Sequence, residues 1–173
     1  MSRELLVLRH GKSDWSSDAA SDFERPLAAR GRKAVKRMGR WLREEQLAPD
    51  YIVSSPAKRA EQTALRACEY AGIPSKLIVW NERIYEADVP DLLRVLAQCP
   101  RDNRRVMIVG HNPGLADLVA YLGGDLIEIP PDGKLMPTAA LAQLELPDKW
   151  KGLEQGCARA LCITRARDLE VQL

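Results

Sequence analysis

LLVLRHG, residues 5–11, places four apolar residues before an arginine, a histidine and a glycine. A short apolar run that ends in polar residues and glycine predicts a buried strand followed by a loop. The same pattern returns in VMIVGHNPG, residues 106–114. The chain has two histidines, and each of them directly follows a predicted strand.

Short apolar runs alternate with segments of helical spacing, which is typical of parallel strands joined by crossover helices. We therefore predict an α/β fold, a three-layer α/β/α sandwich with a mostly parallel sheet. The last two predicted strands follow no clear helix, which allows a mixed sheet. The predicted strands cover residues 5–9, 51–54, 76–79, 106–110, 141–146 and 160–164.

Helices are expected where apolar residues recur at helical spacing, within residues 34–42, 60–71, 90–98 and 115–122. Gly72 should end the second of these helices, and Gly123 with Gly124 the fourth. The segment IPPDGKLMP, residues 129–137, is rich in turn residues and predicts a surface loop.

Length and composition favour one domain, which we expect to span residues 1–173. Lys and Arg total 26 against 24 Asp and Glu, a formal charge of +2. This balance is far from that of a dedicated nucleic-acid binder, so no nucleic-acid partner is predicted.

The N-terminal apolar run is too short for a signal peptide or a membrane span, so a cytoplasmic location without membrane attachment is expected. Four cysteines occur without CxxC spacing and far from the histidines. This pattern favours free thiols over disulfides or a structural zinc site.

In an open α/β sheet, ligands bind at the carboxyl ends of the strands, where both histidines are expected. SSPAKRAEQT, residues 54–63, also begins where a strand ends and would carry Arg59 on the first turn of a helix. Backbone N–H groups at a helix start and an arginine fork both suit phosphate oxygens. Two unrelated histidines and a solvated Lys58–Arg59 pair are the alternative. Clustering of Arg9, His10, Arg59 and His111 favours a phosphate pocket.

Three motifs also carry a family resemblance: RHG at residues 9–11, SSPxxRAxQT at 54–63 and GHNPG at 110–114. In this order they resemble the histidine phosphatase superfamily. The segment DFERPLAARG, residues 22–31, and the short length are further similar to its SixA-like phosphohistidine phosphatase branch. The resemblance spans roughly residues 5–122.

The resemblance implies that His10 takes the phosphoryl group and later gives it to water, with Arg9, Arg59 and His111 around the phosphoryl oxygens. Lys12 and Asn112 are additional candidates for binding phosphate. No metal and no other cofactor is expected. A neutral imidazole at cytoplasmic pH is suited to the nucleophilic role.

Protonation of the leaving group needs an acid, which related phosphoesterases and mutases supply from a segment that resembles IYEAD, residues 84–88. Glu86 is the candidate here. A solvated glutamate before the third helix is the alternative, and Asp14, Asp18 and Asp88 compete for the role.

These motifs predict a metal-independent phosphatase of the SixA-like, protein phosphohistidine type. Its partner would be a phosphorylated protein, such as a histidine phosphotransfer domain, or a phosphorylated small molecule. A small-molecule phosphomonoesterase or phosphoglycerate mutase-like enzyme is the alternative, and a non-catalytic phosphate-binding module the third. Basic residues within 32–43 suggest either a solvated helix face or a surface for an acidic partner.

Overall fold

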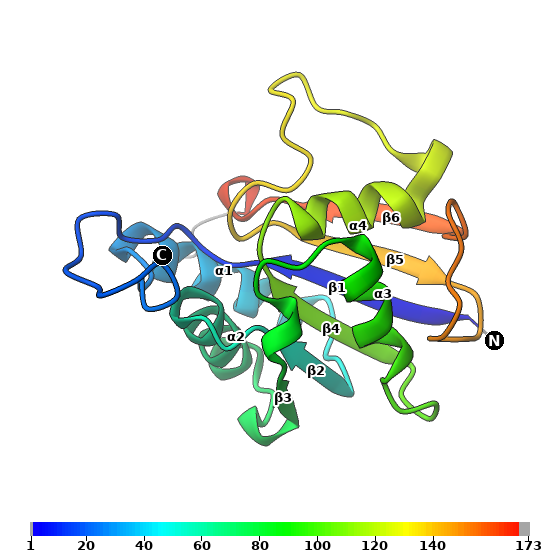
Figure 1. The fold of residues 1–173 in the computed structure, drawn as a ribbon, viewed down its shortest axis with the longest axis horizontal. Helices are drawn as coiled ribbons and strands as arrows, with labels where there is room; N and C mark the ends of the chain where they lie inside the picture. Colours follow the sequence, from blue (N-terminus) through cyan, green and yellow to red (C-terminus); the bar gives the residue numbers. More distant parts are fainter. Residues whose placement is uncertain (1, 170–173) are drawn as a thin grey trace.

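A computed structural model describes residues 2–169. Its centre is a six-stranded sheet of order β3-β2-β4-β1-β5-β6 (Figure 1). The strands are β1 Arg3–Arg9, β2 Tyr51–Ser54, β3 Ile78–Trp80, β4 Arg105–Gly110, β5 Leu141–Leu146 and β6 Ala160–Thr164. The helices are α1 Ala29–Glu44, α2 Lys58–Ala71, α3 Val89–Ala97 and α4 Gly114–Gly123.

The sheet is mixed, which the sequence allowed because no clear helix precedes the last two predicted strands. β3, β2, β4 and β1 pair in parallel, whereas β5 pairs antiparallel with both β1 and β6. The predicted third strand begins two residues too early, because residues 75–77 form a 3-10 turn before β3. The other five strands match the predictions to within two residues at each end.

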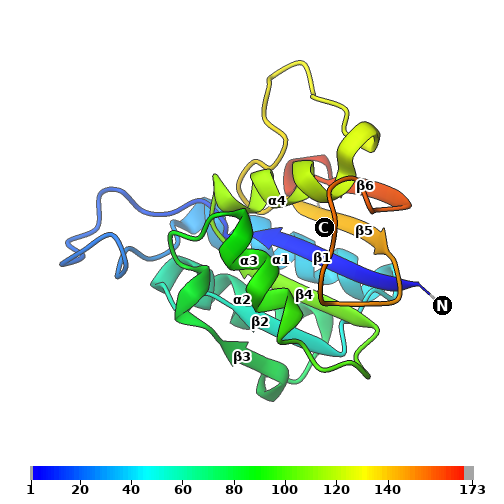
Figure 2. The ribbon, with the colours of Figure 1, turned by 45° about the vertical axis from the view of Figure 1, so that its right-hand side comes forward.

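Helices cover both faces of the sheet, which gives the predicted three layers (Figures 1 and 2). Alternation along β1 decides which side chain enters which core. Leu5 and Val7 point into the core shared with α3 and α4, and Leu6 and Leu8 point into the core shared with α1 and α2. All four are fully buried, as expected for a central strand.

Helix α1 places its basic residues opposite its buried face. Val35, Met38 and Leu42 are fully buried on the sheet, while Lys36 and Arg40 lie over the ring of Tyr70 from α2. The geometry is that of an amphipathic helix with a solvated cationic face. The choice between this interpretation and a surface for an acidic partner stays open.

Two long connections project from the layers, one beyond the carboxyl end of β1 and one above α4 (Figures 1 and 2). Residues 11–28 join β1 to α1, and residues 127–140 lead from α4 toward β5. The second contains the loop predicted at 129–137, which is confirmed. No helix within residues 2–169 is long and apolar enough to cross a membrane.

The loop after β1 packs directly on the first turn of α1, and this contact depends on glycine. A Cβ on Gly31 would lie 2.1 Å from the carbonyl oxygen of Lys12. A Cβ on Gly11 would in turn lie 2.9 Å from the carbonyl oxygen of Gly31. The glycines therefore fix where the chain runs immediately after His10.

We expect Gly31→Ala to lower the free energy of unfolding by about 1–3 kcal/mol, the usual effect of overpacking. Alanine normally stabilises a helix interior relative to glycine. A decrease in the free energy of unfolding would therefore indicate the close contact between Gly31 and the Lys12 carbonyl. Urea denaturation measures the change, with Arg30→Ala as the control on the neighbouring exposed position. Stabilisation by Gly31→Ala would contradict the packing described.

Candidate active site

The order β2-β4-β1 brings the carboxyl ends of three parallel strands side by side. His10 follows β1, His111 follows β4, and Ser55 follows β2. The backbone N–H of His10 donates to the carbonyl oxygen of Gly110 at 3.0 Å, which carries the parallel pairing past the end of β1. The two imidazole rings lie with centroids 5.2 Å apart, so the predicted meeting of the histidines occurs.

The imidazole of His10 is held through its Nδ1 atom. Its Nδ1–H donates to the carbonyl oxygen of Gly11 at 2.7 Å, which leaves the lone pair of Nε2 available. The ring is only 6% exposed. Burial, reinforced by the charges of Arg9 and Arg59, lowers the pKa of His10 to about 4. The imidazole is therefore neutral at neutral pH, as nucleophilic attack requires.

The imidazole of His111 is held through its Nε2 atom. The hydroxyl of Ser55 accepts from the backbone N–H of Ala57 at 3.2 Å and lies 2.8 Å from Nε2 of His111. The Ser55 hydroxyl can donate to Nε2 or accept from it, so this contact holds the ring without assigning its proton. Burial and the nearby His10 lower the pKa of His111 to about 3.

Arg59 is clamped by Asp22 from the loop between β1 and α1. Its Nη1 donates to the carbonyl oxygen of Asp22 at 2.7 Å, and its Nη2 donates to Oδ2 at 2.9 Å. Tyr85 donates its hydroxyl to the same Oδ2 at 2.7 Å, and Arg25 pairs with Oδ1. The hydrogen bond from Tyr85 and the two arginines hold the pKa of Asp22 well below its usual range.

Arg9 and Asn112 share one anchor in the 127–140 connection. The carbonyl oxygen of Met136 accepts from Nη1 of Arg9 at 3.1 Å and from Nδ2 of Asn112 at 2.8 Å. Burial and the charge of Arg59 lower the pKa of Arg9. Two cations held close together in this way favour an anion between them.

The unpaired donors of this group show where that anion would lie. Within residues 2–169, four buried side-chain nitrogens lack a hydrogen-bond partner: Arg3 Nε, Arg9 Nε, Arg59 Nε and His111 Nδ1. Arg3 Nε still forms an ion pair with Asp148 at 3.1 Å. The other three belong to the predicted phosphate pocket, and buried donors normally have partners. These three nitrogens are therefore available to an anionic group.

Glu86 lies beside this group in a pocket of about 430 Å³. It is exposed and has a left-handed backbone, with φ of 57°. Gly114 permits this approach, because a Cβ there would lie 2.4 Å from the carbonyl oxygen of Ala87. The segment containing Glu86 is thus packed against the start of α4, next to His111.

The competing carboxylates have other surroundings. Asp14 accepts from the backbone and hydroxyl of Ser16, and Asp18 is exposed in the same loop. Asp88 caps the N-terminus of α3 and also lines the pocket of Glu86. Lys12 is exposed, and only its backbone carbonyl has a role in the packing, as acceptor for Ala28. The catalytic and phosphate-binding roles of all the predicted site residues stay predictions.

Sequence reasoning assigned no role to Ser55, Asp22, Tyr85 or Thr63. Thr63 accepts from the backbone N–H of Gly11 at 3.1 Å and donates to the carbonyl oxygen of Arg59 at 2.7 Å. All four lie inside segments that the sequence already singled out: SSPAKRAEQT, DFERPLAARG and the stretch before Glu86. The sequence motifs include these residues, but they do not indicate which contacts the residues form.

The two aromatic residues of the first loop differ in exposure. Phe23 packs edge-on against Tyr85, with centroids 5.1 Å apart. Trp15 is 73% exposed and lies under the guanidinium of Arg25 at 3.6 Å. Phe23 therefore packs against a residue of the site, whereas the ring of Trp15 lies mostly in solvent.

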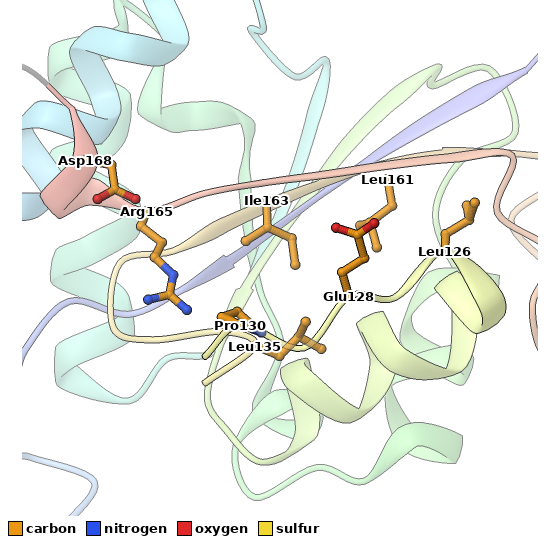
Figure 3. A pocket seen from close by; sticks show the side chains of 8 residues that line it. All are labelled: Leu126, Glu128, Pro130, Leu135, Leu161, Ile163, Arg165 and Asp168. Atoms are coloured by element: carbon orange, nitrogen blue, oxygen red, sulfur yellow. The ribbon is translucent and has the colours of Figure 1, made fainter. Parts of the chain in front are cut away.

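A second hollow, of about 380 Å³, lies between residues 126–135 and β6 (Figure 3). Leu135, Leu161 and Ile163 form much of its lining. Its arginine, Arg165, is engaged by Asp132 at 2.7 and 3.1 Å. None of the predicted phosphate-binding residues lines it. In the described part of the chain, no three His, Cys, Asp or Glu side chains are grouped as metal ligands.

The buried histidines lead to a testable titration. In a tag-free protein, NMR of the two imidazole C2–H groups should show no midpoint near the ordinary 6.5, and both rings should stay neutral down to pH about 5. Folded pKa values of about 4 and 3 lie below the unfolded value. The stability they contribute is therefore present above pH 6.5 and lost as pH falls toward 4 and 3. A midpoint of 6 or above for either ring would contradict the burial described.

Comparison with known proteins agrees with this geometry. The model of the histidine phosphatase superfamily (branch 1) matches residues 5–94. Phosphohistidine phosphatase SixA of Escherichia coli K12 is 30% identical over 152 residues, which cover 86% of this chain and 89% of that protein.

Solved structures extend the likeness to the whole fold. The SixA-type protein of Nakamurella multipartitia superposes with a TM-score of 0.81 at 25% identity, over 95% of this chain and 96% of that one. The protein histidine phosphatase SixA complexed with tungstate gives a TM-score of 0.77 at 25% identity, over 96% and 99% of the two chains. The chain belongs to the histidine phosphatase superfamily, in its SixA-like branch.

Proposed function

We propose that this protein is a metal-independent phosphatase that acts through a phosphohistidine intermediate on His10, and that its substrate is phosphohistidine in a protein. The observation that carries the proposal is the group of three unpaired buried nitrogens, on Arg9, Arg59 and His111, whose side chains interact electrostatically beside a neutral imidazole. This arrangement provides a nucleophile and the charge complement of a phosphoryl group.

In the first step, Nε2 of His10 attacks phosphorus, and the bond from phosphorus to the leaving atom breaks with its electron pair on that atom. Arg9 and Arg59 are held in place before substrate arrives, by Met136 and Asp22 respectively. Such fixed donors stabilise the charge of the transferring group without reorganisation. A phosphoryl dianion would also favour the charged form of His111 and raise its pKa.

In the second step, water attacks the phosphorus on His10, and the P–N bond breaks with its electron pair on Nε2. The hydrogen bond from Nδ1–H to Gly11 persists, so the ring returns to its starting tautomer. The attacking water loses one proton to the surrounding solvent. The products are inorganic phosphate and the free enzyme.

Two considerations favour phosphohistidine over a phosphate ester. The SixA relatives bear the name of phosphohistidine phosphatases. A phosphorylated imidazole can also take up a proton before the P–N bond breaks, so it leaves as a neutral ring and needs little help from an acid. The partner is then a phosphorylated protein, with a histidine phosphotransfer domain as the finer proposal. One domain over residues 1–173 and a cytoplasmic location stay predictions.

Glu86→Gln tests the substrate class. We expect it to slow hydrolysis of an alkyl phosphate by about 10², the lower end for general acid catalysis, because Glu86 is exposed. Hydrolysis of phosphohistidine should fall by less than about tenfold, because its leaving group needs no proton from Glu86. Steady-state kcat/KM on both substrates measures the contrast, with Glu82→Gln as an exposed control on the same segment.

The outcomes separate the alternatives. A wild-type kcat/KM that favours the alkyl ester, and that loses this preference in Glu86→Gln, would support a small-molecule phosphomonoesterase instead. Equal, small losses on both substrates would remove Glu86 from the mechanism and transfer the role to Asp14, Asp18 or Asp88. Wild-type protein that binds phosphate but releases none from any substrate would support a non-catalytic module.

A further inference from the structure

Tyr85 contacts both sides of the candidate site. Its hydroxyl donates to Oδ2 of Asp22 at 2.7 Å, the same oxygen that accepts from Nη2 of Arg59 at 2.9 Å. Its ring meets the ring of His111 edge-on, with centroids 5.4 Å apart. The guanidinium carbon of Arg59 lies 6.0 Å from the centroid of the tyrosine ring. One side chain therefore adjoins Arg59, which belongs to α2, and His111, which follows β4.

The segment around Tyr85 is packed tightly on both sides. Ile84 is only 2% exposed, and a Cβ on Gly110 would lie 2.7 Å from its Cγ2. The carbonyl oxygen of Ala87 would lie 2.4 Å from a Cβ on Gly114. These two glycines are the last residue of β4 and the first residue of α4. The tyrosine is thus carried by backbone that rests on a strand end and a helix start.

Asp22, in contrast, is an exposed residue of the 11–28 connection. Arg59 uses two nitrogens on it: Nη1 donates to its carbonyl oxygen at 2.7 Å and Nη2 to Oδ2. Because a guanidinium group is planar, two such hydrogen bonds define its plane. The hydrogen bond to Asp22 raises the pKa of the Tyr85 hydroxyl, which therefore stays protonated and continues to donate at neutral pH.

Resting on the proposed function, we propose that Tyr85 is a positioning residue for phosphoryl transfer, because it fixes the carboxylate of Asp22 and thereby the plane of the Arg59 guanidinium relative to His111. Tyr85 needs no contact with the substrate for this role. A guanidinium that is displaced still attracts a phosphoryl dianion by its charge, but it no longer matches the transition state. The effect of Tyr85 should therefore appear in the rate of transfer rather than in the affinity for phosphate.

Tyr85→Phe tests the proposal, because it keeps the ring and removes the hydroxyl. We expect kcat/KM to fall about tenfold, the effect of losing one hydrogen bond to a charged group. The loss should be equal on phosphohistidine and on an alkyl phosphate, since the same group is transferred from both. The inhibition constant of inorganic phosphate should change by less than about twofold, because the charge of the site is kept.

Tyr121→Phe is the matched control. The Tyr121 hydroxyl is also a donor within the protein, to the carbonyl oxygen of Leu153 at 3.4 Å, and neither residue contacts the predicted phosphate pocket. This variant should retain the kinetics of the wild type. Urea denaturation checks that both tyrosine variants are folded under the conditions of the assay.

A double-mutant cycle with Arg59→Lys separates positioning from a general structural role. An ammonium group has no plane for Asp22 to orient. Tyr85→Phe should therefore lower kcat/KM by less than about twofold in the Arg59→Lys background, because two changes that act through one residue are not additive. Independent effects would instead multiply, and the second substitution would again cost about tenfold.

Four outcomes would overturn the positioning role: a full tenfold loss in the Arg59→Lys background, unchanged kinetics of Tyr85→Phe, inhibition by phosphate weakened as much as kcat/KM, or a loss confined to the alkyl phosphate. The last of these would make Tyr85 a proton donor to the leaving group. In all four cases, turnover that depends on His10 would leave the proposed function intact. Absence of turnover by the wild type on both substrates would contradict both proposals.

Discussion

The His10→Ala variant is expected to lose at least about 10⁴ of kcat/KM on every substrate, because removing a nucleophile eliminates the covalent route. The structure gives no second group with the same geometry among the residues that surround the site. The ring centroid of His111 lies 5.2 Å away, but its Nε2 is engaged by Ser55. Initial rates on phosphohistidine and an aryl phosphate measure the loss.

The fold should survive this substitution. The His10 side chain makes one hydrogen bond, to the carbonyl of its own neighbour Gly11, and the backbone bonds that join its segment to β4 and Ala139 remain. The free energy of unfolding should therefore change by about 1 kcal/mol or less. Appreciable turnover by a folded His10→Ala protein would contradict the assignment of the nucleophile.

Arg59→Ala is expected to reduce kcat/KM by about 10³, the upper end for loss of one fixed donor, because this donor is charged. Arg59 contacts both the carbonyl and the carboxylate of Asp22 while its Nε stays free for a ligand. Removal of the Arg59 side chain also removes two hydrogen bonds that Asp22 accepts. Arg59→Lys should recover only part of the loss, because an ammonium group cannot reproduce the planar fork.

Lys58→Ala is the control for Arg59, since Lys58 precedes it in α2 and directs its ammonium toward Glu61 at 3.4 Å. It should retain nearly full activity. Near-wild-type kinetics for both Arg59 variants would place Arg59 outside the phosphoryl site and leave the unpaired Nε without a function. Equal activity of Arg59→Lys and the wild type would show that charge alone suffices.

Features fixed by local patterns were predictable from the sequence. The apolar runs of 5–8 and 106–109 specify buried strands, and residues directly after such strands must lie at one edge of a parallel sheet. The meeting of His10 and His111 follows from this, once β1 and β4 are neighbours. The αL end of α2 at Gly72 likewise follows from one residue.

Contacts that join distant loops were not predictable. The Asp22–Arg59 clamp depends on how residues 11–28 fold over the sheet edge, and the shared anchor at Met136 depends on a backbone carbonyl that any residue type could supply. The pairing of Tyr85 with Asp22 spans 63 residues. No periodicity encodes such contacts, because they result from the packing of irregular segments rather than from one element.

The central claim is that His10 carries the phosphoryl group, and rapid-quench mass spectrometry tests it most directly. Wild-type protein mixed with phosphohistidine donor and quenched in alkali should carry one phosphoryl group on the peptide that contains His10, stable in base and lost in acid. The phosphopeptide should appear and decay at rates that match turnover, and His10→Ala should show none. Turnover by the wild type without any phosphoryl group on His10, or a phosphoryl group on His111 instead, would contradict the mechanism.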